Sequence, residues 1–184
     1  MSVISRIASE IGVPERSLRR AVSEGVVKAR RSGPRRLRLN PGEDEYLRSH
    51  WPLLIQMREA LRYEPNVRIA VLYGSTARGD DDPSSDIDLL VQLEDHDLMK
   101  RSALQARLEA KLGREVDIAE FERVVGTDPL LLLQAVDEGR VLADRSGEWK
   151  EVRSRRPAIY KRAMRSYQGQ MREAADALQK VTGI

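Results

Sequence analysis

The chain has 184 residues, 41% of them hydrophobic and 33% charged, which suits one domain of ordinary size plus a small one and excludes a disordered protein. It has no cysteine and only two histidines, so disulfides, thiolate catalysis and Cys- or His-rich metal centres are excluded and a metal must bind carboxylates. Without a long apolar run or a signal-peptide pattern, we expect a cytoplasmic protein with no membrane partner.

The net charge of +3 conceals three segments of different sign. Residues 1–40 hold ten Lys/Arg against three Asp/Glu, residues 41–143 hold twelve against twenty-one, and residues 144–184 hold ten against five. The basic first segment suggests a polyanionic partner, and the acidic middle suggests divalent cations or a basic partner. The charge distribution by itself fits a solvated surface better than it fits any of these partners.

Two short helices and a β-hairpin are predicted for the first forty residues. Helical spacing covers residues 3–9 and 14–24, and Pro14 fits the first helical turn, where its missing N–H costs nothing. After Gly25, two short alternating stretches surround a Gly-Pro turn, which is typical of a hairpin. A natural boundary follows at residues 40–42.

The rest of the chain alternates between helical and strand patterns. The predicted elements are a helix over 43–63 that Pro52 should interrupt or restart, strands over 67–73 and 87–93, a helix over 98–112, a strand over 115–121, a helix over 130–137 and an amphipathic helix from about 149 onward. The last helix carries a stripe of Tyr and Met residues. We expect this stripe to pack on the protein's own sheet or on a second copy, and less readily to dock a partner protein.

The candidate site lies in residues 74–91, which read G-S-T-A-R-G-D-D-D-P-S-S-D-I-D-L-L-V. Asp86 and Asp88 are two apart on a predicted strand, so their carboxylates share one face. Two like charges held this close call for a cation, and oxygen-only ligands suit Mg²⁺ or a similar ion. At the end of the preceding strand, Gly74 lets backbone N–H groups and the Ser75 hydroxyl approach phosphate oxygens.

A third carboxylate, Asp117, sits centrally in the strand predicted over 115–121. An unpaired carboxylate in that apolar context is costly, so we expect Asp117 to share the same metals, either as a ligand or as the base that takes a hydroxyl proton. Arg78 is expected to reach a phosphate or the substrate chain, and Ser85 completes the nucleotide-binding candidates. Other polar residues are predicted to be solvated (Asp80, Asp81, Asp82, His96) or to serve in packing or capping (His50).

The pattern of Gly-Ser, a spacer, Asp-x-Asp and a later strand Asp resembles the DNA-polymerase-beta-like nucleotidyltransferase superfamily over residues 67–143. The G-S-x-A-R-G start and the S-D-I-D-L-L-V finish are most similar to minimal nucleotidyltransferases, which are often paired with HEPN-domain proteins in toxin-antitoxin systems. The segment D-P-L-L-L-L-Q-A-V-D-E-G-R-V-L-A-D-R also looks like their C-terminal helix and strand.

This resemblance implies an α+β (mixed α/β) fold with a small mixed sheet, flanking helices and a C-terminal helix. It also implies an EC 2.7.7-type enzyme that moves a nucleoside monophosphate, AMP from ATP, onto a hydroxyl of a protein or RNA. Mg²⁺ or Mn²⁺ would be the cofactor, and a HEPN-type protein or RNA the acceptor. Asp86, Asp88 and Asp117 would be both the metal ligands and the catalytic residues.

The first forty residues resemble a winged helix-turn-helix, with I-A-S-E-I-G-V-P-E-R-S-L-R-R-A-V as the two helices and R-R-S-G-P-R-R as the wing tip. That geometry implies contacts to double-stranded DNA by a homodimer. The candidate DNA-binding residues are Arg16, Arg19, Arg20, Arg30, Arg31, Arg35 and Arg36. Alternatively, this basic segment packs on the body, or binds RNA or an acidic protein.

We therefore expect a winged helix-turn-helix domain over 1–41, a nucleotidyltransferase domain over 42–148 and a C-terminal helix over 149–184. The first functional hypothesis is an enzyme in a toxin-antitoxin or regulatory module whose DNA-binding domain controls transcription. The alternative is a DNA-binding transcriptional regulator whose nucleotidyltransferase body senses nucleotide and is catalytically silent. An enzyme acting on antibiotics is disfavoured, because the chain has no large acceptor domain.

Overall fold

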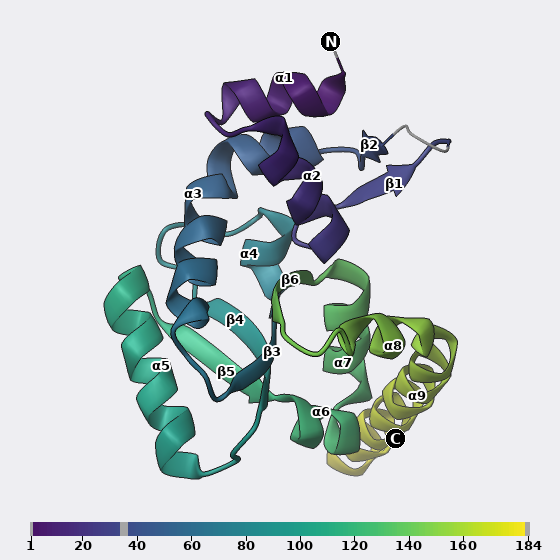
Figure 1. The fold of residues 1–184 in the computed structure, drawn as a ribbon. Coiled ribbons are helices and arrows are strands. Elements are labelled where there is room, and N and C mark those ends of the chain that lie inside the picture. Colours follow the sequence, from purple (N-terminus) through teal and green to yellow (C-terminus); the bar gives the residue numbers. More distant parts are fainter. Residues whose placement is uncertain (1, 34–36, 183–184) are drawn as a thin grey trace.

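The computed structural model describes residues 2–33 and 37–182 (Figure 1). In chain order its elements are α1 (Val3–Glu10), α2 (Glu15–Glu24), β1 (Ala29–Arg31), β2 (Leu37–Leu39), α3 (Glu43–Arg62), β3 (Val67–Tyr73), α4 (Gly74–Arg78), β4 (Ile87–Leu93), α5 (Leu98–Leu112), β5 (Val116–Glu120), α6 (Phe121–Thr127), α7 (Pro129–Glu138), β6 (Arg140–Asp144), α8 (Trp149–Ser154) and α9 (Arg156–Thr182).

A four-stranded sheet with the order β5-β4-β3-β6 forms the centre of the body. β3 pairs antiparallel with β4 and β6, whereas β4 pairs parallel with β5. A parallel pair needs a crossover connection, and α5 provides it. This mixed sheet with flanking helices confirms the predicted α+β fold class.

Helices cover both faces of the sheet, with α3 and α5 on one side and α6 and α7 on the other, where α9 forms a further layer on α7 (Figure 1). Successive strand residues point to opposite faces, so each strand contributes to two cores. The core under α3 and α5 receives Ala70, Leu72, Ile87, Leu89, Val116 and Ile118, and the core under α6 and α7 receives Ile69, Val71, Tyr73 and Leu90.

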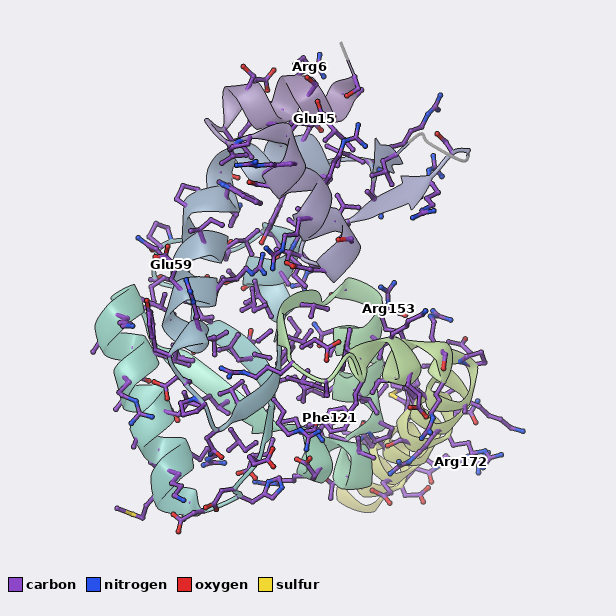
Figure 2. All side chains as sticks on the ribbon, in the orientation of Figure 1. Arg6, Glu15, Glu59, Phe121, Arg153 and Arg172 are labelled. Carbon is purple, nitrogen blue, oxygen red and sulfur yellow. The ribbon has the colours of Figure 1, made fainter. Side chains whose placement is uncertain are left out.

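The N-terminal segment of α1, α2 and the antiparallel β1–β2 hairpin packs against the N-terminal half of α3 (Figure 1). Buried side chains of this segment, including Ile4 and Leu18, belong to the same core cluster as Leu47 of α3. Charged side chains such as Arg6 and Glu15 lie on its outer surface (Figure 2). One hydrophobic core therefore includes side chains from both sides of residues 40–42. The division into three domains stays a prediction.

A buried ion pair joins this N-terminal segment to the body. Arg140 at the start of β6 is 2% exposed and donates to both carboxylate oxygens of Glu43 at 2.6 and 3.0 Å. The same guanidinium donates to the carbonyls of Val26, at 3.2 Å, and Ala77, at 2.8 Å. Arg140 of β6 thus links α4, the segment after α2 and the start of α3, which are distant from it in sequence.

The prediction that Pro52 interrupts its helix is wrong, because α3 runs through it as one helix of 20 residues. Pro52 cannot donate to the carbonyl of Arg48, a loss that usually costs about 3 kcal/mol or more. Both residues lie on the exposed side of α3, where water can satisfy that carbonyl. Leu47, Trp51 and Leu54 are buried on the opposite side, so packing maintains the helix on both sides of the proline.

Two short helices, α4 and α6, fall outside the sequence prediction. They have five and seven residues, which is too short for a hydrophobic period to stand out. α6 begins directly at Phe121, so β5 is one residue shorter at each end than the strand predicted over 115–121. Phe121 lies where α6 meets α8 (Figure 2), with its ring edge-on to Trp149 at 6.4 Å between centroids.

The tail forms two helices, α8 and α9, that are separated at Arg155. α9 packs on α7 and buries Ala163, whereas Tyr160, Tyr167 and Met171 are 47%, 49% and 54% exposed. The expectation that this stripe packs on the protein's own sheet is therefore wrong, because α7 already covers that face; a second copy or a partner stays a prediction. Neither α9 nor any other helix over residues 2–33 and 37–182 is long and apolar enough to cross a membrane.

Candidate functional site

Asp86 and Asp88 flank the start of β4. Ile87 and Leu89 are fully buried on the α3 and α5 side of the sheet. Because side chains alternate along a strand, the two carboxylates are directed to the opposite face, where Asp88 is half-buried and Asp86 is exposed. The predicted shared face for the Asp-x-Asp pair is consistent with this arrangement.

The sheet aligns a third carboxylate with this pair. In the strand registers, Asp88 pairs with Tyr73 of β3 on one side and with Asp117 of β5 on the other. The two aspartates are therefore direct neighbours in a parallel ladder. The expectation of an apolar setting for Asp117 is wrong, because β5 is the edge strand and leaves this side chain exposed.

Asp86, Asp88 and Asp117 form a row of carboxylates, the acidic row, whose negative charges repel one another. Burial raises the pKa of Asp88, and the negative charges of Asp117 and Asp86 raise it further, with only Arg78 acting in the opposite direction. Burial also raises the pKa of Tyr73, again with contributions from Asp88 and Asp117. A cation placed among these groups would relieve the repulsion and favour the ionised carboxylates.

Gly74 brings the start of α4 against this row. Its φ is +72°, a conformation that L side chains rarely adopt, and a Cβ built on it would lie 2.1 Å from Oδ2 of Asp88. A larger residue at this position would therefore require the carboxylate of Asp88 or the start of α4 to move. The first backbone N–H groups of α4, which begins at Gly74 and continues with Ser75, have no partners within the helix and are thus available close to Asp88.

Arg78 and Ser85 are both engaged in contacts within the protein. The guanidinium of Arg78 donates to Asp80 at 3.2 Å and to Glu138 at 3.1 Å, and these hydrogen bonds raise its pKa. The hydroxyl of Ser85 accepts from the backbone N–H of Asp82 at 3.0 Å. Their roles in nucleotide binding, like those of Gly74 and Ser75, stay predictions.

The prediction that the Asp80–Asp82 stretch is solvated is wrong for Asp81. Its side chain is only 5% exposed and lies between His50 and Arg114, which sequence reasoning did not include among the candidates. The predicted packing role of His50 is confirmed, since its ring stacks on Tyr46 with 4.4 Å between centroids. His96 is 49% exposed, as predicted for a surface residue.

The carboxylates offer part of a metal site. Within residues 2–33 and 37–182, no group of three or more His, Cys, Asp or Glu side chains is placed to hold a metal ion. The neighbouring pair Asp88 and Asp117 nevertheless fits a hard divalent cation, because all its donors are oxygens and the pKa of Asp88 is raised by burial and by the nearby negative charges. Mg²⁺ commonly takes one or two protein carboxylates and completes its shell with water and nucleotide phosphates.

A cavity of about 380 Å³ adjoins the row at Asp117 and Tyr73. Two arginines, Arg101 from α5 and Arg123 from α6, also contribute to its wall. Arg101 donates to Glu120 at 3.1 Å, while its buried Nε has no hydrogen-bond partner. The wall also includes the carboxylates of Glu120 and Asp128, so the space beside Asp117 has charges of both signs and suits a polar molecule.

The basic residues predicted to bind DNA lie at the surface of the N-terminal segment. Arg16, Arg19 and Arg20 of α2 are exposed, as are Arg30 and Arg31 of the hairpin. Arg19 pairs with Glu15 and Arg20 with Glu24, each at 2.6 Å. The remaining candidates, Arg35 and Arg36, lie outside the described residues.

Comparison with known structures identifies the same fold in toxin-antitoxin proteins. A chain from the crystal structure of a toxin-antitoxin with AMP-PNP has a TM-score of 0.54 and 22% identity, and the match covers 66% of this chain and 98% of that one. A chain from the structure of a tri-AMPylated Shewanella oneidensis HEPN toxin in complex with MNT antitoxin has a TM-score of 0.52 and 20% identity, covering 68% and 98%. No curated protein matches the sequence.

One protein family matches the part of the chain that contains the candidate site. Residues 56–148, just over half of the chain, match the family described as "Polymerase beta, Nucleotidyltransferase". This span contains Gly74, Asp86, Asp88 and Asp117, the residues that the sheet and α4 bring together. The chain therefore belongs to the polymerase beta nucleotidyltransferase family.

Proposed function

We propose that the chain is a nucleotidyltransferase that moves a nucleoside monophosphate, AMP from ATP, onto a hydroxyl of a protein or RNA with the help of Mg²⁺ or Mn²⁺. The observation that carries this proposal is that the start of α4 at Gly74 lies against Asp88, whose neighbour in the parallel ladder is Asp117. Phosphoryl-type transfer depends mainly on positioning and charge neutralisation, and these groups supply both.

Each group has a part in the reaction. The turn at Gly74 and Ser75 would hold the triphosphate through backbone N–H groups and a hydroxyl. The adjacent carboxylates of Asp88 and Asp117 would hold the cation, with Asp86 as the proposed third ligand and with water and phosphate oxygens completing the shell. A divalent cation held by these carboxylates would supply charge neutralisation at the phosphates and a lower pKa for the attacking hydroxyl. The acceptor oxygen forms a bond to the α-phosphorus, the bond to pyrophosphate breaks, and the hydroxyl proton leaves to a base. Asp117, which borders the cavity, would be a ligand of the cation or the base that takes the hydroxyl proton.

ATP as donor and a HEPN-type protein as acceptor are supported by the two structural relatives. One relative is in a crystal structure with AMP-PNP, and the other is from a complex of an MNT antitoxin with a tri-AMPylated HEPN toxin. By analogy we assign this chain to a toxin-antitoxin or regulatory module. RNA is the alternative acceptor.

Binding of double-stranded DNA by the N-terminal segment is a separate part of the proposal. Support comes from the net charge of +7 over residues 1–40 and from the arrangement of α1, α2 and the β1–β2 hairpin. In a winged helix-turn-helix, α2 would enter the major groove and the hairpin would meet adjacent phosphates. Replacing Arg16 or Arg19 by Ala should then cost about 1–3 kcal/mol on a preferred site, if either reads a guanine edge.

The test of the enzymatic proposal is to incubate the chain with each labelled NTP, Mg²⁺ and cell extract, and to identify what becomes labelled. Asp86→Asn and Asp88→Asn should lower transfer by several orders of magnitude while the chain stays folded, because charge rather than shape is removed. Asp44→Asn, a change at a carboxylate on α3 away from the row, is the matched control. Normal transfer by the Asp86→Asn/Asp88→Asn double variant would contradict the proposal. Nucleotide binding without any transfer by the wild-type chain would favour a nucleotide-sensing regulator instead.

A further inference from the structure

A buried polar cluster lies beneath the loop that leads to the Asp-x-Asp pair. Its centre is Asp81, whose Oδ2 accepts from Nη1 of Arg114 at 2.9 Å and whose Oδ1 lies 2.8 Å from Nε2 of His50. The side chains of Asp81, His50 and Arg114 are 5%, 15% and 14% exposed. Three elements, α3, the loop after α4 and the turn before β5, thus meet at one carboxylate.

Arg114 also binds the backbone next to the candidate catalytic aspartates. Its Nε and Nη2 donate to the carbonyl of Ser85 at 2.9 and 2.5 Å, and Nη2 donates to Oγ1 of Thr76 at 3.2 Å. The hydroxyl of Thr76 is itself 3.4 Å from the carbonyl of Asp86. Thr76 is fully buried in α4, so one guanidinium bridges the end of the loop and the helix that begins at Gly74.

The cluster is anchored from behind by α3. Tyr46 stacks on His50 with an interplanar angle of 5°, and its hydroxyl donates to the carbonyl of Thr76 at 3.1 Å. Burial by itself would raise the pKa of Asp81, but hydrogen bonds from His50 and Arg114 outweigh it and hold that pKa below its ordinary value. Asp81 is therefore an ionised acceptor that keeps both partners oriented toward the loop.

We propose that Arg114, held by Asp81, is a positioning residue of the nucleotidyltransferase site: it fixes the Ser85–Asp86 backbone against Thr76, and so sets the Asp-x-Asp carboxylates relative to the turn at Gly74. The inference rests on the proposed function of that site. Within residues 2–33 and 37–182, the hydrogen bonds and the ion pair of Arg114 join it to Ser85, Asp81 and Thr76, and not to the acidic row. Its rigid planar fork suits this arrangement, because the guanidinium donates to Asp81, Ser85 and Thr76 from fixed directions, whereas a lysine ammonium is a single compact charge with rotatable donors.

The first test compares Arg114→Lys with Arg145→Lys. Arg145 is a matched control, since its guanidinium also donates to backbone carbonyls, those of Leu61 and Glu64 at 3.2 and 3.0 Å, at the other end of α3. In Arg114→Lys, amide hydrogen exchange of residues 80–88 should become at least about ten-fold faster, because the tether is loosened. Arg145→Lys should leave exchange in that segment unchanged.

The second readout is transfer by the full chain with Mg²⁺ and ATP. A misplacement of about 1 Å costs on the order of a hundred-fold in rate, so Arg114→Lys should lower kcat by roughly 10- to 100-fold while KM for ATP changes little. Arg145→Lys should keep the wild-type kcat even where its melting temperature falls. If Arg114→Lys lowers the melting temperature but keeps the wild-type kcat in the folded fraction, the residue is structural and the proposal is overturned.

A double variant tests the tether without leaving a buried charge unpaired, which could itself prevent folding. Arg114→Met with Asp81→Leu removes both charges, so that no buried charge is left unpaired, and still removes the tether to Ser85. It should fold and show the same loss of kcat; if both this variant and Arg114→Lys fail to fold, the cluster is a folding element and the proposal is wrong. If the wild-type chain transfers nothing, the proposed function fails, and unchanged exchange over residues 80–88 would then overturn the positioning role on its own.

Discussion

Replacing Gly74 by alanine tests the contact on which the candidate site depends. A Cβ at this position would lie 2.1 Å from Oδ2 of Asp88, whereas real Cβ contacts are essentially never shorter than 3.0 Å. The carboxylate or the start of α4 must therefore move by about 1 Å, a displacement that costs on the order of a hundred-fold in a reaction that depends on positioning. The positive φ adds about 1–2 kcal/mol of backbone strain.

Gly113→Ala separates these two effects. Gly113 has a φ of +66°, close to that of Gly74, but a Cβ there would meet nothing within 4 Å. Both variants should lose about 1–2 kcal/mol of unfolding free energy in urea, and only Gly74→Ala should also weaken Mg²⁺-dependent ATP binding and lower kcat. If Gly74→Ala binds ATP and turns over as well as Gly113→Ala does, the close approach of α4 to Asp88 has no part in the reaction.

Three further predictions concern charges in other parts of the chain. The folded-state pKa of Asp88 is raised above its ordinary value of 3.8, so the ionised group destabilises the metal-free chain at neutral pH. Asp88→Asn should therefore raise the metal-free melting temperature at pH 7, and this gain should vanish as the pH falls toward 3.8. Glu43→Gln leaves a buried guanidinium without its carboxylate and should cost about 3–5 kcal/mol in urea unfolding, against less than about 0.5 kcal/mol for Asp44→Asn. Binding of the full chain to duplex DNA should weaken linearly in a log–log plot against salt, and replacing Arg30 and Arg31 by Ala should reduce the slope by roughly two; no binding to any duplex at low salt would rule out the DNA-binding role.

Local patterns were enough to predict most of the secondary structure. The strands over 67–73 and 87–93 and the helix over 98–112 have the predicted bounds, because a period of two or of 3.6 residues directly encodes which face is buried. The errors came where packing outweighed a local signal. Pro52 lies within a continuous α3 because the buried side of that helix is held on both sides of it.

The tail illustrates what a periodic stripe leaves open. The spacing of Tyr160, Tyr167 and Met171 correctly indicated a helix. That helix, α9, nevertheless packs on α7, buries Ala163 and leaves these three side chains exposed. A sequence period identifies an apolar stripe but not its partner, because the partner is chosen by shape and by which surfaces remain uncovered.

The sequence by itself determined the Asp-x-Asp pair on one face of a strand, the glycine before it and the presence of a third strand aspartate, since each depends on neighbours only a few residues away. Only the tertiary structure decided that Asp117 lies beside Asp88, because the register of a parallel pair is set across the intervening crossover. The same holds for the contacts of Arg114 with Asp81 and of Arg140 with Glu43, which join residues 33 and 97 positions apart. Such ion pairs leave no periodic signal, because they exist only once the hydrophobic cores have brought their elements together.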